Sequence, residues 1–230
     1  MGSSPAGWEN HHVRARVTTV AATLGTAGPL AYLALTVVLG LLEPGYDVLR
    51  DTQSELGAVD AAHPTAMNVG GFMGLGVSLL GVSVAYVLVL RGGWATWVAG
   101  GLVAVAGVGM VVVGFFPCDS GCVDVTLTGR LHGILSAPGA IALSGAAMLS
   151  ARVLALDGRF GRSWSWASFV IGLLALCSGP LVALELLGDA NGLLQRAGMW
   201  PPLLWAAALS WRLLVLTRRG ATPGSRTSSG

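Results

Sequence analysis

Six long apolar runs, separated by short polar segments, dominate the pattern of hydrophobic and polar positions along the chain. Each run has about the length that a helix needs to cross roughly 30 Å of hydrocarbon. The pattern therefore predicts an all-α protein, a polytopic bundle of six transmembrane helices. The expected spans are Val17–Leu42, Met67–Leu90, Trp94–Phe116, Leu131–Leu156, Trp166–Leu187 and Met199–Leu216.

Arginine residues are distributed unevenly between the segments that join these runs. With the N-terminus placed in the cytoplasm, ten arginines fall in cytoplasmic segments and three fall in outer loops. Positively charged residues concentrate on the cytoplasmic side of multi-pass proteins. The pattern therefore predicts that both termini are cytoplasmic. We expect a transmembrane domain at residues 17–217, between disordered tails at residues 1–16 and 218–230.

The composition agrees with a protein that is mostly surrounded by lipid. Hydrophobic residues make up 53% of the chain and charged residues 10%, whereas soluble domains carry about 25% charged residues. These charges are too few to build a water-facing surface, so we expect membrane lipids as partners. The net charge of +2 comes without a basic stripe that has interleaved aromatic residues, which argues against a nucleic-acid partner.

Polar and ionisable residues gather in the expected outer segments, while the span interiors are nearly free of charge. A buried carboxylic acid at the outer mouth would have a raised pKa and could donate a proton. A histidine could act there as a base or a relay near neutral pH. The candidate catalytic residues are Asp51, Glu55, Asp119, His132 and Glu185. The candidate residues for binding a substrate are Tyr46, Ser54, Asn68, Phe72, Phe116, Ser136, Gln195, Arg196 and Trp200.

A structural interpretation of the same residues stays open. They would then cap helices, pair with arginines and hold loops at the interface, scattered around the rim with separate partners. The functional interpretation instead expects Asp119, His132 and one acid of the first outer loop to surround a single pocket. Ionisable residues at membrane depth are candidates for function, and both interpretations fit the sequence.

Two familiar chemistries are poorly supported by these residues. Ser136 and His132 are four residues apart and share a helix face, but this geometry rarely aligns a nucleophile with its base, and no nucleophile-elbow motif surrounds the serine. A catalytic metal needs three or more ligands, and His63 and His132 are the two histidines expected outside. Phosphate-loop, dinucleotide and haem motifs are also missing. We therefore expect no metal and no cofactor.

The three cysteines divide into a close pair and a single residue. Cys118 and Cys122 are expected to face an oxidising compartment, with Gly121 between them, and a small disulfide loop is within reach. Two free thiols are the alternative. Cys177 lies inside the fifth apolar run, where we expect it to be a small core residue.

A series of short motifs runs in order along nearly the whole chain. They are Gly28-Pro29, Pro44-Gly45-Tyr46, Ser54-Glu55-Leu56-Gly57-Ala58, Met67-Asn68 with Gly70, Gly71 and Phe72, Phe116-Pro117 with Asp119, Thr128-Gly129, Leu131-His132-Gly133 and Gly192-Leu193-Leu194-Gln195-Arg196. In their order and spacing they resemble the bacterial membrane family called domain of unknown function 998. The resemblance implies six helices in the bacterial plasma membrane and a site around Ser54, Asp119 and His132, but no known reaction. Cys118 departs from the usual pattern of that family, which has another residue at this position.

Three functions remain open at the level of the sequence. The first is a protein that binds a lipid or isoprenoid-like apolar ligand at the outer leaflet. The second is an acid–base enzyme that acts on an apolar substrate, such as a membrane-bound terpene cyclase, in which aromatic side chains would stabilise a carbocation. The third is a small-solute transporter, which the lack of charged residues near the middle of the spans disfavours. A closed aromatic pocket beside one acid would favour the enzyme, and a continuous polar path would favour transport.

Overall fold

Six long helices build the described part of the fold, as the sequence predicts. A computed structural model describes residues 5–184 and 188–221, and each of its six helical segments is long and apolar enough to cross a membrane. The prediction of an all-α protein with six candidate spans is therefore confirmed. The helices are α1 (Pro5–Leu42), α2 (Gly74–Val89), α3 (Trp94–Val113), α4 (Leu127–Leu156), α5 (Arg162–Ala183) and α6 (Asn191–Ala221).

Four short helical turns complete the chain. A π-helical segment, η2 (Ala66–Met73), runs directly into α2, so the two together form the second span. The other three are the 3₁₀ turns η1 (Ser54–Gly57), η3 (Ser120–Cys122) and η4 (Gly188–Ala190). Of these turns, η1 lies in the segment between α1 and η2.

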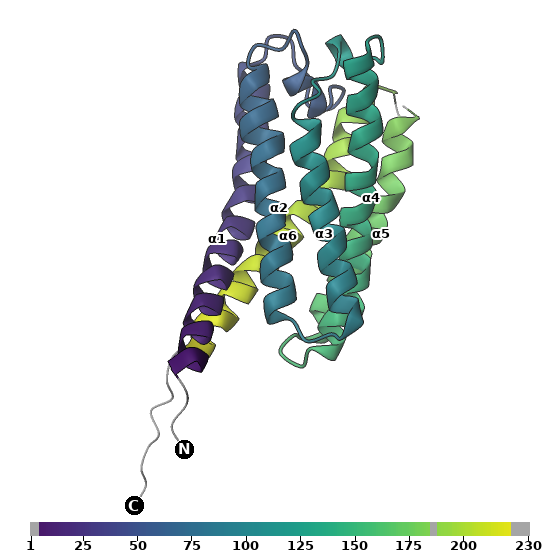
Figure 1. Ribbon diagram of the computed structural model, residues 1–230. Helices are drawn as coiled ribbons and strands as arrows, with labels where there is room; N and C mark the ends of the chain where they lie inside the picture. The colour runs from purple at the N-terminus through teal and green to yellow at the C-terminus, as the bar shows by residue number, and fades with distance from the viewer. Residues whose placement is uncertain (1–4, 185–187, 222–230) are drawn as a thin grey trace, which may run out of the picture.

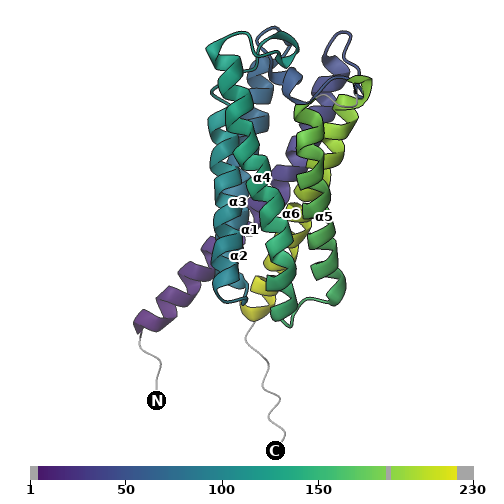
Figure 2. The same ribbon diagram turned by 90° about the vertical axis from the view of Figure 1, so that its right-hand side faces the viewer.

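The helices pack in chain order around the bundle, each against the next, and α6 closes the ring against α1. The start of α1 and the end of α6 lie at the same end of the bundle (Figure 1). We call this the terminal end, and the opposite one, where η1 and η3 lie, the distal end. Near the terminal end, the first turns of α1 diverge from the other helices (Figure 2).

Small residues let neighbouring helices approach closely. A Cβ atom added to Gly76 in α2 would lie 2.5 Å from the carbonyl oxygen of Gly107 in α3, and one added to Gly107 would lie 2.8 Å from the carbonyl oxygen of Gly76. Large apolar side chains are exposed along the outside of the bundle instead, including Val77, Trp97 and Leu174. Close backbone contact inside and apolar side chains outside are what helix association in lipid requires.

Several helices extend beyond the apolar runs that predict them. The first begins at Pro5 rather than Val17, so the residues up to position 16 that the structure describes are helical, whereas the sequence analysis placed them in a disordered tail. Proline suits the first turn of a helix, and hydropathy marks only the part of a helix that contacts lipid. For the same reason α4 begins at Leu127, where the Thr126 side chain caps the Gly129 amide.

An ionic clamp holds the two loops of the terminal end together. The carboxylate of Asp157, which follows α4, accepts hydrogen bonds from the Arg91 amide at 3.0 Å and from the Arg159 guanidinium at 2.6 and 2.7 Å. Arg159 also donates to the Val89 carbonyl, and Arg212 of α6 donates to the Arg159 carbonyl. This clamp was not foreseen from the sequence, because its partners are up to 70 residues apart.

Candidate functional site

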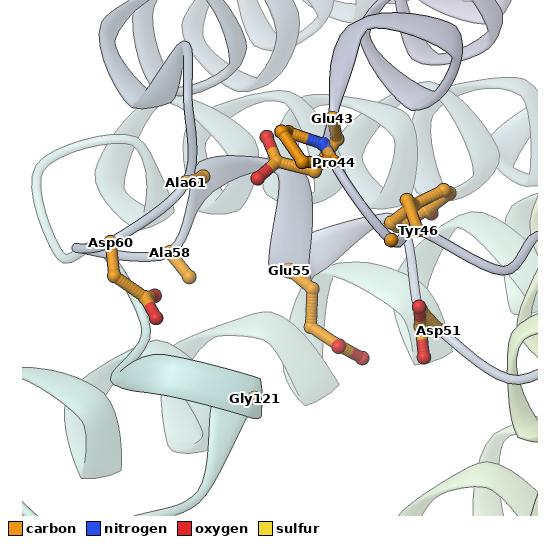
Figure 3. A pocket seen from close by; sticks show the side chains of 10 residues that line it. Glu43, Pro44, Tyr46, Asp51, Glu55, Ala58, Asp60, Ala61 and Gly121 are labelled. Atoms are coloured by element: carbon orange, nitrogen blue, oxygen red, sulfur yellow. The ribbon is translucent and has the colours of Figure 1, made fainter.

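The distal end contains a pocket of about 150 Å³ that is lined mainly by the segment between α1 and η2. Four carboxylates and one tyrosine border it, and its lining contains no arginine (Figure 3). We call it the distal pocket. Its lining residues are Glu43, Pro44, Gly45, Tyr46, Asp51, Glu55, Ala58, Asp60, Ala61 and Gly121.

Three of the four carboxylates are held through one oxygen atom. Glu43 Oε2 accepts from the Ala62 amide at 2.8 Å, and Asp60 Oδ2 accepts from the Ser120 hydroxyl at 2.6 Å. Glu55 Oε1 accepts from the amide and the hydroxyl of Thr52 at 2.8 and 2.9 Å. The second oxygen of each of these groups accepts no hydrogen bond from the described part of the chain. The pocket therefore offers unoccupied acceptor oxygens, and each carboxylate is held in place by the hydrogen bonds of its other oxygen.

The fourth carboxylate, Asp51, belongs to a more complete set of hydrogen bonds. Its two oxygens accept from Arg50 Nε and from the Asp47 amide, each at 2.7 Å. Burial alone would raise the pKa of Asp51, but these hydrogen bonds outweigh burial and hold the pKa below its usual range. Asp51 is therefore ionised at neutral pH, so it is a poor proton donor, and its charge is paired with that of Arg50.

A buried arginine of α6 holds the segment between α1 and η2, which we call the pocket segment. Arg196 is 7% exposed, and its Nη1 atom lies 2.7 Å from the Val48 carbonyl oxygen and 2.9 Å from those of Asp51 and Gly192. Its Nη2 atom donates to the Tyr46 hydroxyl, and the guanidinium carbon lies 5.6 Å from the centre of that ring. Arg196 therefore organises the pocket wall from behind and is not part of its lining.

Tyr46, which accepts a hydrogen bond from Arg196, also binds a later part of the same loop. Its hydroxyl donates to the Thr52 carbonyl at 2.9 Å. Burial raises the pKa of Tyr46 and the charge of Arg196 lowers it, with burial the stronger effect. The phenol therefore keeps the proton that this hydrogen bond needs.

A second group of contacts joins the same loop to α6. Gln195 Oε1 accepts from the Gln53 amide at 2.7 Å, and Trp200 Nε1 donates to Gln53 Oε1 at 2.9 Å. The Gly192 amide donates to the Arg50 carbonyl at 2.9 Å. A Cβ atom at Gly192 would lie 2.3 Å from a backbone oxygen of the loop, so only glycine permits this approach.

Beneath the pocket segment lies a buried polar layer, which we define as Tyr32, Asn68, Phe72 and His132. The ring of Phe72 is 6.3 Å from that of Tyr32 and 5.9 Å from that of His132. Asn68 Nδ2 donates to the Gly57 carbonyl of η1 at 2.8 Å. Three polar atoms of this layer, Tyr32 Oη, Asn68 Oδ1 and His132 Nε2, are buried without a hydrogen-bond partner in the described part of the chain.

The hydrogen bond of His132 decides which ring nitrogen carries a proton. Its Nδ1 atom lies 2.8 Å from the Phe116 carbonyl oxygen, which can only accept. Nδ1 must therefore carry the hydrogen, and in the neutral ring Nε2 presents a lone pair. Nε2 is thus a buried acceptor, or a base, in a residue whose ring contacts that of Phe72.

Asp119 has a structural role at the start of α4. One of its oxygens accepts from the amides of Val125 and Thr126 at 2.9 and 2.7 Å, and the other accepts from the Thr126 hydroxyl at 2.7 Å. The hydrogen bonds from Thr126 lower the pKa of Asp119 below its usual range. Asp119 is consequently ionised and fully engaged in fixing the loop before α4. It does not line the distal pocket.

Ser136 is also engaged by the backbone. Its hydroxyl donates to the His132 carbonyl at 2.6 Å, one helical turn away. That contact uses the hydroxyl hydrogen, and the histidine Nε2 has no partner in the described chain. The two residues therefore do not form the nucleophile–base pair of a hydrolase.

The segment before α4 carries the cysteine pair. The structure joins Cys118 and Cys122 in a disulfide whose Cα atoms are 4.9 Å apart. The Cys118 sulfur lies 3.4 Å from the Ser54 carbonyl oxygen, and the Cys118 carbonyl accepts from the Val59 amide at 3.0 Å. The disulfide loop thus packs on η1. Cys177 is free and exposed, which corrects the expectation of a core residue, because α5 contacts only part of the bundle.

Comparison with known protein families identifies the family to which the chain belongs. A family model described as protein of unknown function (DUF998) matches residues 26–212. The chain belongs to the DUF998 family. The match confirms the resemblance that the ordered motifs indicate, and it covers every segment that builds the distal end. No curated protein and no solved structure matches the chain.

Within this DUF998 protein, the predicted site residues fall into separate groups. Tyr46, Asp51 and Glu55 line the distal pocket. Asn68, Phe72 and His132 form the layer beneath it, while Gln195, Arg196 and Trp200 support it from α6. Ser54 and Phe116 offer backbone carbonyls to neighbouring segments. Glu185 lies outside the described residues.

The sequence analysis of the DUF998 protein missed two acids of the pocket. Glu43 and Asp60 complete the ring of carboxylates, although they were not among the candidate site residues. The available signal was their position, since both lie in the segment that joins the first two spans. The return of that segment on itself, which brings position 43 beside position 62, could not be inferred from local pattern.

Proposed function

We propose that this DUF998 protein binds, in its distal pocket, the cationic and donor-rich head group of an apolar, lipid-like ligand. The observation that carries the proposal is the lining of the pocket by four carboxylates without a basic side chain. Three of these groups keep one oxygen free of hydrogen bonds from the described residues. Acceptors that carry negative charge favour an ammonium or another positively charged donor.

The surroundings of the pocket support an apolar body for this ligand. Leu41 and Leu42 directly precede the pocket acid Glu43, and they are 82% and 55% exposed. Val59, which directly precedes Asp60, is exposed as well. An acyl or isoprenoid chain can pack on such side chains while its head group enters the pocket. A membrane lipid with an amine head group fits both requirements.

The orientation of the protein in the membrane is part of the proposal. Ten arginines against three support placing the terminal end in the cytoplasm and the distal pocket outside. A phosphatase reporter fused after Arg218 should be inactive in a bacterial plasma membrane, and one inserted at Asp47 should be active. The opposite result would reverse the orientation while leaving the binding proposal to its own test.

One observation favours an acid–base enzyme as a second candidate. His132 Nε2 is a buried base that has no hydrogen-bond partner among the described residues. The centre of the His132 ring lies 5.9 Å from that of the Phe72 ring. A terpene cyclase, however, needs a protonated acid in an aromatic cavity, whereas Asp51 and Asp119 are held ionised and the pocket lining contains one aromatic residue. Transport receives no support, because the buried charges of the described chain lie near helix ends.

The binding proposal can be tested with purified protein in lipid nanodiscs. The melting temperature should rise when phosphatidylethanolamine is added to phosphatidylcholine nanodiscs, because its primary ammonium can donate to the free carboxylate oxygens. Glu55→Gln, which keeps the acceptor for Thr52, and Asp60→Asn should reduce this rise. Asp189→Asn is the matched control, since Asp189 is exposed and lies outside the pocket lining. Equal rises in all variants would refute the proposal.

A further inference from the structure

A second hollow lies at the terminal end of the bundle, and the proposed function does not use it. It has a volume of about 420 Å³ and lies between the end of α4 and the first turns of α5. Its lining combines one arginine, one serine and two aromatic residues with an alanine. The lining residues are Ala155, Phe160, Arg162, Ser165 and Trp166.

The serine in this lining lacks the hydrogen bond that several other helical serines of the chain make, as Ser210 of α6 also does. Ser144, Ser150 and Ser168 each donate to the carbonyl four residues earlier, which is the usual way for a serine in an apolar helix to satisfy its hydroxyl. Ser165 Oγ is shielded from solvent and has no partner among the described residues. Because no described residue uses this hydroxyl, rotation about the Cα–Cβ bond can turn it toward a group that enters the hollow.

Positive charge is available at the same place. Arg162 is exposed and makes no hydrogen bond or ion pair with the described residues. It is also the first residue of α5, whose N-cap Gly161 offers no capping side chain. The amides and dipole at this helix start therefore add to the arginine charge. The one acid of the neighbouring loop, Asp157, is neutralised by Arg159.

Exposed aromatic and apolar side chains extend from the hollow along the outer surface of α5. Trp166 is 58% exposed, as expected of a tryptophan at a membrane interface. On the same face of α5, Phe169, Val170 and Leu173 are exposed at positions three, four and seven residues further along. Phe160, on the other side, is fixed by Arg212, whose guanidinium carbon lies 5.9 Å from the ring centre.

We propose that this hollow binds the phosphate of an anionic phospholipid in the leaflet at the terminal end of the bundle. Arg162 and the hydroxyl of Ser165 would hold the phosphate oxygens, and Trp166 would lie at the level of the glycerol backbone. The exposed side chains of α5 then receive an acyl chain. This apolar continuation favours a lipid over free phosphate. Basic pockets beside transmembrane helices bind anionic head groups in this way.

The experiment compares lipid retention in variants of the full-length protein. Protein in phosphatidylcholine nanodiscs is titrated with phosphatidylglycerol, and bound lipid is counted by native mass spectrometry after release. We expect Arg162→Gln to weaken phosphatidylglycerol binding about five-fold and Ser165→Ala to weaken it about ten-fold. Ala155→Trp, which fills the hollow, should abolish the tightest binding. Arg16→Gln is the matched control, because Arg16 is exposed at the same end of the bundle.

Each outcome supports or overturns the proposal. Loss of binding in the three hollow variants, with binding retained in Arg16→Gln, supports it. Equal, small losses in Arg162→Gln and Arg16→Gln, with no loss in Ser165→Ala and Ala155→Trp, would show only a diffuse attraction of surface charge and overturn it. Millimolar inorganic phosphate that displaces phosphatidylglycerol completely would also overturn it, because the acyl chain would then contribute nothing.

Discussion

The sharpest test of the distal architecture is replacement of Arg196 by lysine. The substitution keeps the positive charge but replaces a planar fork of donors by a single nitrogen on a shorter chain. In the structure, the guanidinium reaches the Tyr46 hydroxyl through one nitrogen and three loop and helix carbonyls through another. One ammonium cannot reach all four acceptors from the same Cα position.

The expected loss follows from counting these contacts. If lysine keeps two of the four, two hydrogen bonds from a charged donor are lost, at about 1.5 kcal/mol each. The free energy of unfolding should therefore fall by about 3 kcal/mol. For a protein of this size that corresponds to a melting temperature lower by roughly 6–12 °C.

Two measurements check this prediction. The first is the melting temperature of the purified protein in detergent, with Arg130→Lys as the control, because Arg130 is exposed at the same end of the bundle. The second is the rate of trypsin cleavage after Arg50, an exposed residue of the loop that Arg196 holds. Arg196→Lys should accelerate that cleavage, and Arg130→Lys should not.

The reasoning would be refuted if Arg196→Lys had the same melting temperature as Arg130→Lys and trypsin cut it after Arg50 at the wild-type rate. A lower melting temperature without faster cleavage would place the contribution of Arg196 elsewhere than in docking the loop.

Three further predictions concern other parts of the fold. Because the pKa of Asp119 is lowered on folding, its contribution to stability is present above about pH 4 and is lost as the pH falls through the lowered value. Asp119→Asn should melt at a lower temperature at pH 7 and lack this acid-dependent step; an unchanged pH profile would contradict the assignment. Asp157→Asn removes a buried ionic clamp and should cost about 3 kcal/mol of unfolding free energy, and a melting temperature equal to that of the wild type would contradict it. A maleimide should modify Cys177 alone until a reductant opens the Cys118–Cys122 disulfide; modification of all three cysteines beforehand would disprove the pairing.

The six spans could be predicted from sequence because a single physical quantity, the length of uninterrupted apolar chain, determines them. The helix ends could not, since α1 begins at Pro5 and α6 continues to Ala221 in segments that hydropathy does not mark. Those ends depend on capping and on backbone hydrogen bonding, which continue into the polar segments.

The candidate site was only partly predictable. Tyr46, Asp51 and Glu55 were selected because the topology brings them to one membrane face, and they do line one pocket. The same argument grouped Asp119 with them, although its oxygens are occupied by Val125 and Thr126. Shared topology gives the membrane face of a side chain, but its hydrogen-bond partners depend on how each loop folds back.

The attachment of the pocket segment to α6 has a consequence for biosynthesis. Gly192, Gln195 and Arg196 belong to α6, which is made after the five other described spans, and they hold a loop that follows the first span. Until α6 has inserted against α1, the backbone carbonyls of that loop have no arginine to accept from, and the distal pocket has no supporting wall. The pocket is therefore completed only when α6 inserts, and a chain truncated before α6 retains all the lining residues without the arrangement that makes them a site.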